Sequence, residues 1–169
     1  PDRAAAVLAE QAGAARQAIT TLLDLSRGIY PRELADEGLV AAVRAAVTRS
    51  PVPVVVADDG LGRLPSAVET ALYFFVMEAV QNAGKHSGAG AVHVHLAVAQ
   101  GCWQARVADD GHGFEPAAPG PGSGLANLRD RLDAVAGTLS VSSGPTGTCV
   151  VGRVPVTAAV PRQAAGRKA

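Results

Sequence analysis

The stretch EAVQNAGKH, residues 78–86, places a carboxylate, an amide, a lysine and a histidine within nine positions. At about 100° per residue, a helix would bring Glu78, Asn82 and Lys85 onto one face. His86 would lie beside them. Carboxylate and amide oxygens can hold a hydrated Mg²⁺, and a lysine one turn further on can neutralise a phosphate. A solvated helix edge has the same pattern, so this stretch alone predicts either a ligand site or a plain polar face.

A second stretch, VADDGHGF at 107–114, places a carboxylate where an apolar run gives way to glycines. Asp109, Gly111 and Gly113 form the pattern D-x-G-x-G. The carboxylate can accept a hydrogen bond from an exocyclic amine, and the glycines permit a sharp turn or the close approach of a ligand. A plain Asp-Gly turn has the same sequence, so DxGxG alone is weak evidence for a site.

The third stretch is GPGSGLANLRDR at 120–131, in which Gly122 and Gly124 precede a predicted helix. The free N–H groups and the dipole of a helix N-terminus favour an anion. A flexible loop with a glycine N-cap would have the same sequence. The strong signal is the order and spacing of all three stretches, and no Walker A motif or dinucleotide fingerprint competes with it.

Hydrophobic periodicity predicts the elements that must position these stretches. Residues 65–86 are expected to form a helix, because apolar residues recur at i, i+3 and i+4. This core-facing stripe consists of Val68, Leu72, Phe75, Val76, Ala79 and Ala83. Alternation predicts strands over 91–99 and 102–110, with Gln100-Gly101 as the hairpin turn. A helix over 123–137 would end at a C-cap glycine, Gly137. LSVSS and GTCVVGRVPV predict two more strands.

The N-terminal part predicts two helices and a strand. A helix over 2–28 carries a partial apolar stripe, which would pack on the domain's own surface or on a helix of a second chain. Pro31 interrupts the chain, and Asp36 suits the N-cap of a helix that runs to Thr48. VVVA at 54–57 reads as a buried strand. The whole order predicts an α+β fold: a mixed sheet covered by helices on one face, preceded by an N-terminal helix.

Composition excludes several classes of protein. The 169 residues carry 15 basic and 15 acidic side chains, whereas nucleic-acid binders normally show a basic surface. The cysteines, Cys102 and Cys149, are too far apart for a metal motif and suit reduced thiols of a cytosolic protein. No apolar run approaches the ~20 residues of a membrane span. A start at Pro1 without Met indicates a fragment of a longer chain.

In this order the motifs resemble the nucleotide-binding boxes of the GHKL ATPases. Residues 78–86 resemble the N box, 109–113 the G1 box, 122–125 the G2 box, and Gly147-Thr148 the G3 box. Within that superfamily the chain is most similar to the catalytic ATP-binding domain of bacterial sensor histidine kinases. The resemblance covers about residues 20–156. It implies a two-layer α/β sandwich that binds ATP and Mg²⁺.

The resemblance also implies roles for single residues. Asn82 would coordinate Mg²⁺, and Glu78 would lie by the metal and the γ-phosphate, as the two catalytic residues. Asp109 would accept a hydrogen bond from the adenine amino group, and Thr148 would lie near the base. Further ATP contacts are implied for Lys85 and His86 at phosphates or ribose, for Gly111 and Gly113 beside the base, and for Gly122, Gly124 and Leu125 in the hinge of a lid.

One departure from the family pattern shapes the expected organisation. Residues 1–30 contain no histidine, so the phosphoacceptor is expected outside this sequence. Residues 1–50 would be the end of the dimerisation-helix region and a linker, residues 51–157 the ATP-binding domain, and residues 158–169 a disordered tail. Implied partners are ATP, the histidine-bearing dimerisation helix and a response regulator, in a homodimeric cytoplasmic kinase whose membrane anchor, if any, lies elsewhere.

Two other functions share much of the pattern. An anti-sigma-type serine kinase has the same E-x-x-x-N box, but it does not explain the N-terminal helix and the GIYPREL junction. A non-catalytic regulatory module would keep the fold, yet the intact Glu78, Asn82, Asp109 and motif glycines argue against it. Phosphoryl transfer from ATP to histidine is therefore the expected activity.

Overall fold

The computed structural model describes residues 31–114 and 124–159. The predicted helix over 2–28, Gly122 and most of the predicted tail lie outside these ranges. Within them, no helix combines the length and hydropathy that a membrane span requires.

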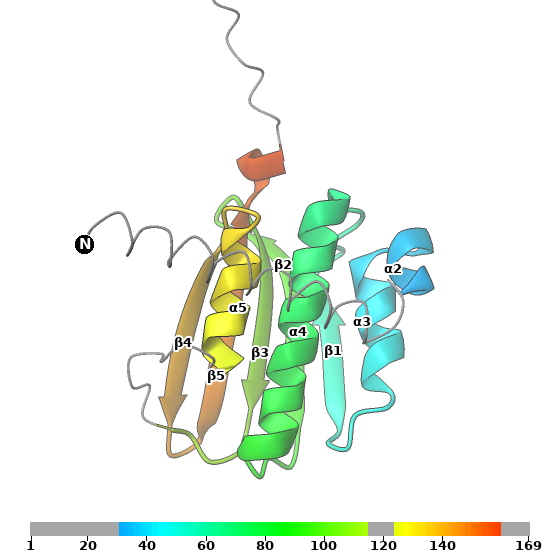
Figure 1. Ribbon diagram of the computed structural model, residues 1–169. Helices are drawn as coiled ribbons and strands as arrows, with labels where there is room; N and C mark the ends of the chain where they lie inside the picture. The colour runs from blue at the N-terminus through cyan, green and yellow to red at the C-terminus, as the bar shows by residue number, and fades with distance from the viewer. Residues whose placement is uncertain (1–30, 115–123, 160–169) are drawn as a thin grey trace, which may run out of the picture. The chain divides into compact units, whose positions relative to one another are not determined.

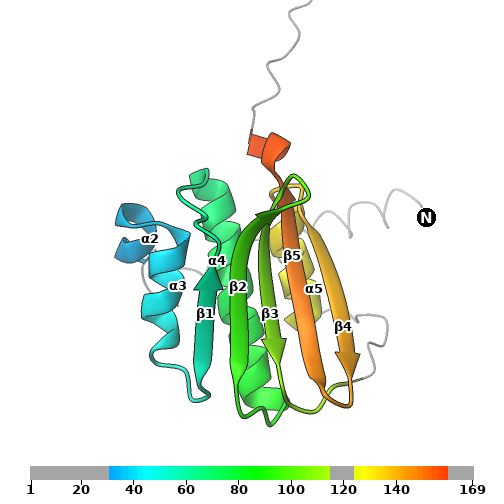
Figure 2. The ribbon, with the colours of Figure 1, turned by 180° about the vertical axis from the view of Figure 1, so that it is seen from behind.

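Five strands form one mixed sheet in the order β1-β2-β3-β5-β4 (Figures 1 and 2). Strands β1 and β2 are parallel, and the other neighbouring pairs are antiparallel. The strands are β1 Val54–Asp58, β2 Val92–Ala99, β3 Cys102–Asp109, β4 Thr138–Gly144 and β5 Gly147–Pro155. Each predicted strand is present, and the predicted α+β fold with a mixed sheet is confirmed.

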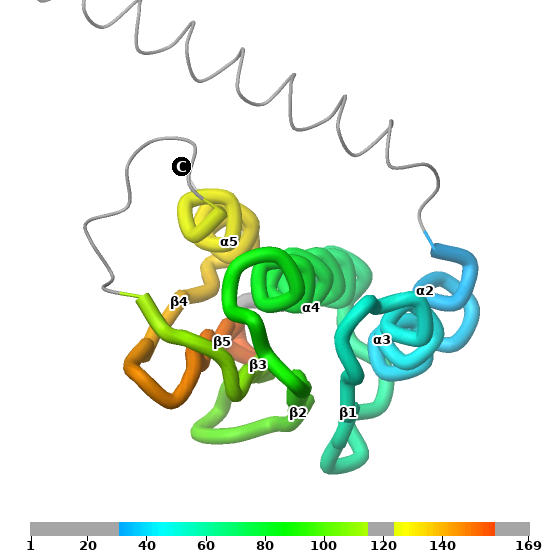
Figure 3. The backbone as a smooth tube through the Cα atoms, turned by 90° about the horizontal axis from the view of Figure 1, so that it is seen from below, coloured from blue at the N-terminus to red at the C-terminus, as the bar shows by residue number. Residues whose placement is uncertain are grey.

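The long helices lie together on one face of this sheet, as the end-on view shows (Figure 3). Seen from behind, the strands stand in front, and none of the described helices covers them (Figure 2). The described helices are α2 Arg32–Asp36, α3 Leu39–Val47, α4 Ser66–His86, α5 Gly124–Asp133 and a short 3₁₀ helix, η1 Val156–Ala159. The core therefore lies between the helical layer and the inner face of the sheet.

Helix α4 runs along the centre of that layer and matches its prediction closely. All six residues of the predicted stripe are buried, and Leu72, Phe75 and Val76 have no exposed surface. They pack with alternate residues of the strands, among them Val92, Val94 and Leu96. Because this stripe is fixed against the sheet, the polar edge of the helix is held in a defined direction.

The predicted start of the second helix is wrong. Asp36 does not cap it but is the last residue of α2, and α3 begins at Leu39 after Gly38. Gly38 has φ +91°, a conformation that favours glycine, and a Cβ there would lie 2.8 Å from Cδ of Arg63. The chain turns at Gly38, where the side chain of Arg63 leaves no space for a Cβ.

The prediction that VVVA is a buried strand is also wrong. β1 is an edge strand whose residues alternate between half-buried and exposed, and Val55 is 55% exposed. Among residues 31–114 and 124–159, no helix lies over its outer face and only β2 pairs with it. A short apolar run cannot distinguish a central strand from such an edge.

Gly137 closes α5 differently from the prediction. The left-handed residue is Ala136, with φ +54°, and the Gly137 N–H donates to the Leu132 carbonyl at 2.7 Å, as in a Schellman motif. A Cβ on Gly137 would lie 2.8 Å from the Arg153 carbonyl of β5. The glycine is thus required by close packing on the sheet rather than by a positive φ.

The compact unit that carries the sheet begins at Glu33. Leu34, Leu39 and Val43 are fully buried in its core. Helices α2 and α3 thus pack with the sheet.

A buried carboxylate fixes the junction between these helices and α4. Glu69 has no exposed surface, and it accepts hydrogen bonds from Arg63 Nε at 3.0 Å and from the Leu64 N–H at 3.0 Å. Arg63 also donates to the carbonyls of Ala35 and Asp36 at 3.1 and 3.3 Å. The arginine therefore links the end of α2 to the first turn of α4.

We expect Glu69→Ala to lower the free energy of unfolding by about 2–3 kcal/mol, because the Leu64 N–H would lose its acceptor in a buried position. Arg63 is half exposed, so water would solvate it and the loss stays moderate. Urea unfolding measures the change, with Glu37→Ala, an exposed carboxylate in the same region, as the control within about 0.5 kcal/mol. Equal stability of the two variants would contradict this role of Glu69.

Candidate functional site

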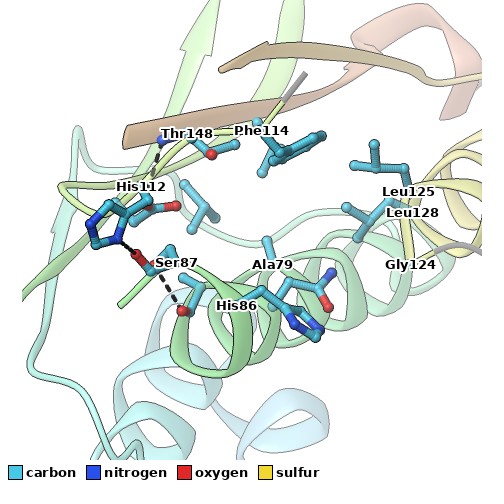
Figure 4. A pocket seen from close by; sticks show the side chains of 15 residues that line it. Ala79, His86, Ser87, His112, Phe114, Gly124, Leu125, Leu128 and Thr148 are labelled. Carbon is cyan, nitrogen blue, oxygen red and sulfur yellow. Dashed lines mark hydrogen bonds between the residues drawn. The ribbon is translucent and has the colours of Figure 1, made fainter. Parts of the chain in front are cut away.

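A cavity of about 380 Å³ lies between α4, the start of α5 and the adjoining ends of β3 and β5. Residues of all three predicted motifs line it, namely Asn82, His86, Asp109, Gly113, Gly124 and Leu125, together with the predicted site residue Thr148 of β5. Figure 4 shows Thr148 and Phe114 on one side, Ala79 and His86 on the other, and Leu125 and Leu128 at one end. The tertiary structure thus brings together stretches that are separate in the sequence.

Three predicted residues are described but do not line this cavity. Glu78 is half-buried one turn before Asn82 on α4, and Lys85 is exposed on the last turn. Gly111 is buried behind the cavity wall, where a Cβ would lie 2.7 Å from Cβ of Ser87. Gly111 therefore allows two backbone segments to touch.

Asp109 is the carboxylate at the end of β3, and backbone groups fix its orientation. Its Oδ1 accepts from the N–H of Gly111 at 3.0 Å and, more weakly, from the N–H of Thr148 at 3.4 Å. Within the described residues Oδ2 accepts no hydrogen bond. One carboxylate oxygen is therefore held in place while the other is available to an N–H donor in the cavity.

The start of α5 lies directly against Asn82. A Cβ on Gly124 would lie 2.9 Å from Asn82 Nδ2, so only glycine lets the helix begin this close. The N–H groups of a first helical turn have no partners within the helix, and together with the helix dipole they favour an anion. Asn82 and the α5 N-terminus thus form a polar wall of the cavity.

The other walls are mostly apolar: Ala79, Ala83, Val107, Leu125, Leu128 and Val150 line them. A flat aromatic group fits such walls if its polar edge meets Asp109. Among the described residues, no group of three or more His, Cys, Asp or Glu is placed to hold a metal ion. A metal at this site would need Asn82, with Glu78 one turn away, and ligands from the bound molecule or water.

Sequence reasoning missed three residues that shape the site: Phe114, Ser143 and Ser87. Phe114 directly follows DxGxG, lines the cavity and is 44% exposed. Its N–H donates to Ser143 Oγ at 2.8 Å, and Ser143 Oγ lies 3.0 Å from the hydroxyl of Thr148. Ser87 follows His86 and contacts the DxGxG loop. Phe114 and Ser87 each adjoin a recognised motif, which is the only signal the sequence offered for them.

Asp110, next to Asp109, has a structural role at the cavity's edge. Its Oδ1 accepts from the N–H groups of Gly90 and Ala91 at 2.8 and 3.0 Å. The hydrogen bond from Ala91, ahead of that from Gly90, lowers the pKa of this carboxyl below its ordinary value. Asp110 therefore stays ionised at neutral pH and ties its loop to the segment before β2.

The D-x-G-x-G pattern occurs a second time, in VADDGLG at 56–62, which differs from VADDGHG at 107–113 only at the sixth residue. The first copy ends β1, and no residue of it lines the cavity. Register pairs Asp109 with Val92, the first residue of β2, but Asp58 with Leu96 in the middle of that strand, so the two copies lie at different places along β2. The motif alone does not specify a site.

Comparisons with known proteins agree on one family. A family model described as "Histidine kinase-, DNA gyrase B-, and HSP90-like ATPase" matches residues 67–158. Over 166 residues the chain is 32% identical to the sensor histidine kinase MctS of Rhizobium johnstonii, and the match covers 93% of this chain and 36% of that protein. The chain thus spans little more than a third of this relative's length.

Solved structures share the fold. The blue-light activated histidine kinase EL346 of Erythrobacter litoralis superposes with a TM-score of 0.57 at 24% identity, covering 70% of this chain and 40% of that one. Full-length ShkA in complex with AMPPNP gives a TM-score of 0.56 at 24% identity, covering 70% of this chain and 29% of that one. At this identity both matches support the architecture.

The glycines around the cavity provide a structural test. A Cβ on Gly113 would collide with the backbone carbonyl of Gly144, whereas a Cβ on Gly144 would meet nothing within 4 Å. We expect Gly113→Ala to lower the free energy of unfolding by about 3 kcal/mol, and Gly144→Ala to change it by less than about 0.5 kcal/mol. Thermal or urea unfolding of the pair measures this, and equal effects would contradict the close contact.

Proposed function

Because the chain belongs to the family of histidine kinase-, DNA gyrase B- and HSP90-like ATPases, we propose that it is the ATP-binding catalytic domain of a two-component sensor histidine kinase. The observation that carries the proposal is the single cavity in which Asn82, Asp109 and the start of α5 meet. The similarity to MctS supports the assignment to a sensor histidine kinase rather than to another branch of the family.

Asp109 would select adenine. The 6-amino group of adenine can donate to Oδ2 of Asp109, while Oδ1 remains bound to the backbone. Guanine carries a carbonyl oxygen at that position, so two acceptors would face each other without a proton between them. The base would lie between the apolar walls, and Thr148 would lie near it. ShkA, which shares the fold, is seen in complex with AMPPNP.

The triphosphate would extend toward Asn82 and the α5 N-terminus. Lys85 and His86, in the last turn of α4, would contact phosphates or ribose, and the hinge expected at Gly122, Gly124 and Leu125 would close over them. Asn82 and Glu78 supply the oxygen donors that Mg²⁺ prefers, and Mg²⁺ commonly keeps several waters beside one or two protein ligands. When bound, Mg²⁺ would neutralise phosphate charge.

The proposed reaction transfers the γ-phosphoryl group of ATP to a histidine of a dimerisation helix outside this sequence. A phosphorus–nitrogen bond forms as the bond between the γ-phosphorus and the β,γ-bridging oxygen breaks, and ADP leaves. The chain's own contribution would be positioning and charge stabilisation. A response regulator would then receive the group. Cys102 and Cys149 are free thiols, which suits the cytoplasmic location proposed for the homodimeric kinase.

Phosphoryl transfer itself can be tested with radiolabelled Mg·ATP and a histidine-bearing dimerisation helix added in trans. We expect a phosphorylated helix whose label is lost in acid and retained in base, as for a phosphoramidate. A label that is stable to acid and lies on serine would favour the serine kinase. Binding of Mg·ATP without any transfer would favour a regulatory module.

Asp109→Asn should weaken ATP binding by about 10- to 100-fold. The hydrogen bond from the adenine amino group to a charged oxygen would be lost, because the amide N–H group of the asparagine would face that amino group, and both are donors. The asparagine oxygen can still accept from Gly111 and Thr148, so the melting temperature should be unchanged. Calorimetric titration measures the affinity. Wild-type affinity in this variant would show that Asp109 does not contact the base.

Asn82→Ala should remove the Mg²⁺-dependent part of the ATP affinity. Loss of an outer-shell partner alone typically costs about 10- to 100-fold in metal affinity, so a direct ligand should cost at least tenfold. Titrations with Mg²⁺ and with EDTA separate this part from binding of the base. Gln81→Ala, the exposed neighbour on α4, is the control. A variant that retains the full Mg²⁺ effect would exclude Asn82 as a metal ligand.

A further inference from the structure

Two loops from different elements lie against each other beside the nucleotide cavity. One follows α4 and comprises residues 87–91, and the other follows β3 and comprises residues 110–113. They are joined at one end by the Asp110 carboxylate and at the other by contacts to Ser87. Because α4 carries Asn82 and β3 carries Asp109, this junction sets the distance between the two polar walls of the cavity.

Ser87 provides a fixed point in this junction. It is 5% exposed, its Oγ donates to the Ala83 carbonyl at 2.8 Å, and the Ala89 N–H donates to the same Oγ at 3.1 Å. The side chain thus closes the last turn of α4 and begins the following turn. As a result, the direction of the Ser87 carbonyl is set by the helix.

His112 donates two hydrogen bonds to that carbonyl. Its backbone N–H lies 2.7 Å from the Ser87 oxygen, and its ring Nδ1 lies 3.0 Å from the same atom. A carbonyl oxygen can only accept, so Nδ1 carries the proton. The ring also contacts Gly88, where a Cβ would be 3.2 Å from Nδ1. Figure 4 shows the ring of His112 turned toward Ser87.

We propose that His112, which occupies the variable slot of DxGxG, is a positioning residue of the nucleotide site. Its imidazole joins the DxGxG loop to the end of α4 and so holds Asp109 at the proper distance from the helix face that carries Asn82. His112 itself lines the cavity, and its ring acts through the Ser87 carbonyl that holds Nδ1. This inference rests on the proposed function, since it assumes that the cavity binds an adenine nucleotide.

The test compares calorimetric titrations of AMP, ADP and ATP, each with Mg²⁺, for the wild type and three variants. In His112→Asn the amide nitrogen can take the place of Nδ1 and keep the hydrogen bond, whereas in His112→Gln it lies one bond further out. His112→Ala removes the donor. His95, half-buried on β2 with its Nε2 3.2 Å from Asp59 Oδ2 and not among the residues that line the cavity, provides the control His95→Ala.

We expect His112→Ala to lower the affinity for all three nucleotides by the same factor, about five- to tenfold, which is the equivalent of one hydrogen bond. His112→Gln should resemble it, and His112→Asn should stay within about twofold of the wild type. His95→Ala should bind normally. Because the His112 side chain is exposed, the variants should fold. If His112→Ala does not fold, the comparison of His112→Asn with His112→Gln decides.

Three results would overturn the inference while leaving the proposed function intact. In the first, His112→Ala and His112→Gln bind nucleotide with wild-type affinity. In the second, His112→Asn loses as much affinity as His112→Ala. In the third, the loss of affinity in His112→Ala grows from AMP to ADP to ATP. The last would mean that the ring touches the phosphates directly. Failure of the wild type itself to bind any of the three nucleotides would overturn the proposed function and this inference with it.

Discussion

The site depends on backbone segments that approach too closely for any side chain to lie between them. A Cβ on Gly111 would meet Ser87, one on Gly113 would meet Gly144, and one on Gly147 would meet the carbonyl of Asp109. These three contacts fasten the end of β3 to helix α4 on one side and to the β4–β5 hairpin on the other. Together with the pairing of β3 to its neighbouring strands, they hold Asp109 in place relative to Asn82.

Helix α4 links the stability of the fold to the chemistry of the site. One face buries Leu72, Phe75 and Val76 against the sheet, and the edge of that face presents Asn82 to the cavity. At its first turn Glu69 and Arg63 connect the helix to α2. The helix therefore cannot rotate to move its polar edge without exposing the apolar core.

Sequence periodicity predicted an element well where regularly spaced apolar residues form the face that packs on the core. This holds for α4, for the β2–β3 hairpin and for the pair β4–β5. It failed where a distant segment decides the outcome. Arg63 lies close against Gly38, after which α3 begins, and β1 has only one strand neighbour among the described residues and is half exposed. Seven predicted site residues line the cavity, whereas Phe114 and Ser87 were identified as part of the site only from their contacts in the tertiary structure.

The two copies of V-A-D-D-G-x-G separate what sequence and tertiary structure each determine. In both, the aspartate Oδ1 accepts from the glycine N–H two residues on, at 2.9 Å for Asp58 and 3.0 Å for Asp109. This local turn follows from the sequence alone, because donor and acceptor are neighbours in the chain. A Cβ on Gly60 would meet nothing within 4 Å, while Gly111 is pressed against Ser87. Only the arrangement of α4, β3 and β5 makes the second copy a cavity wall, because the groups that surround it come from distant parts of the chain.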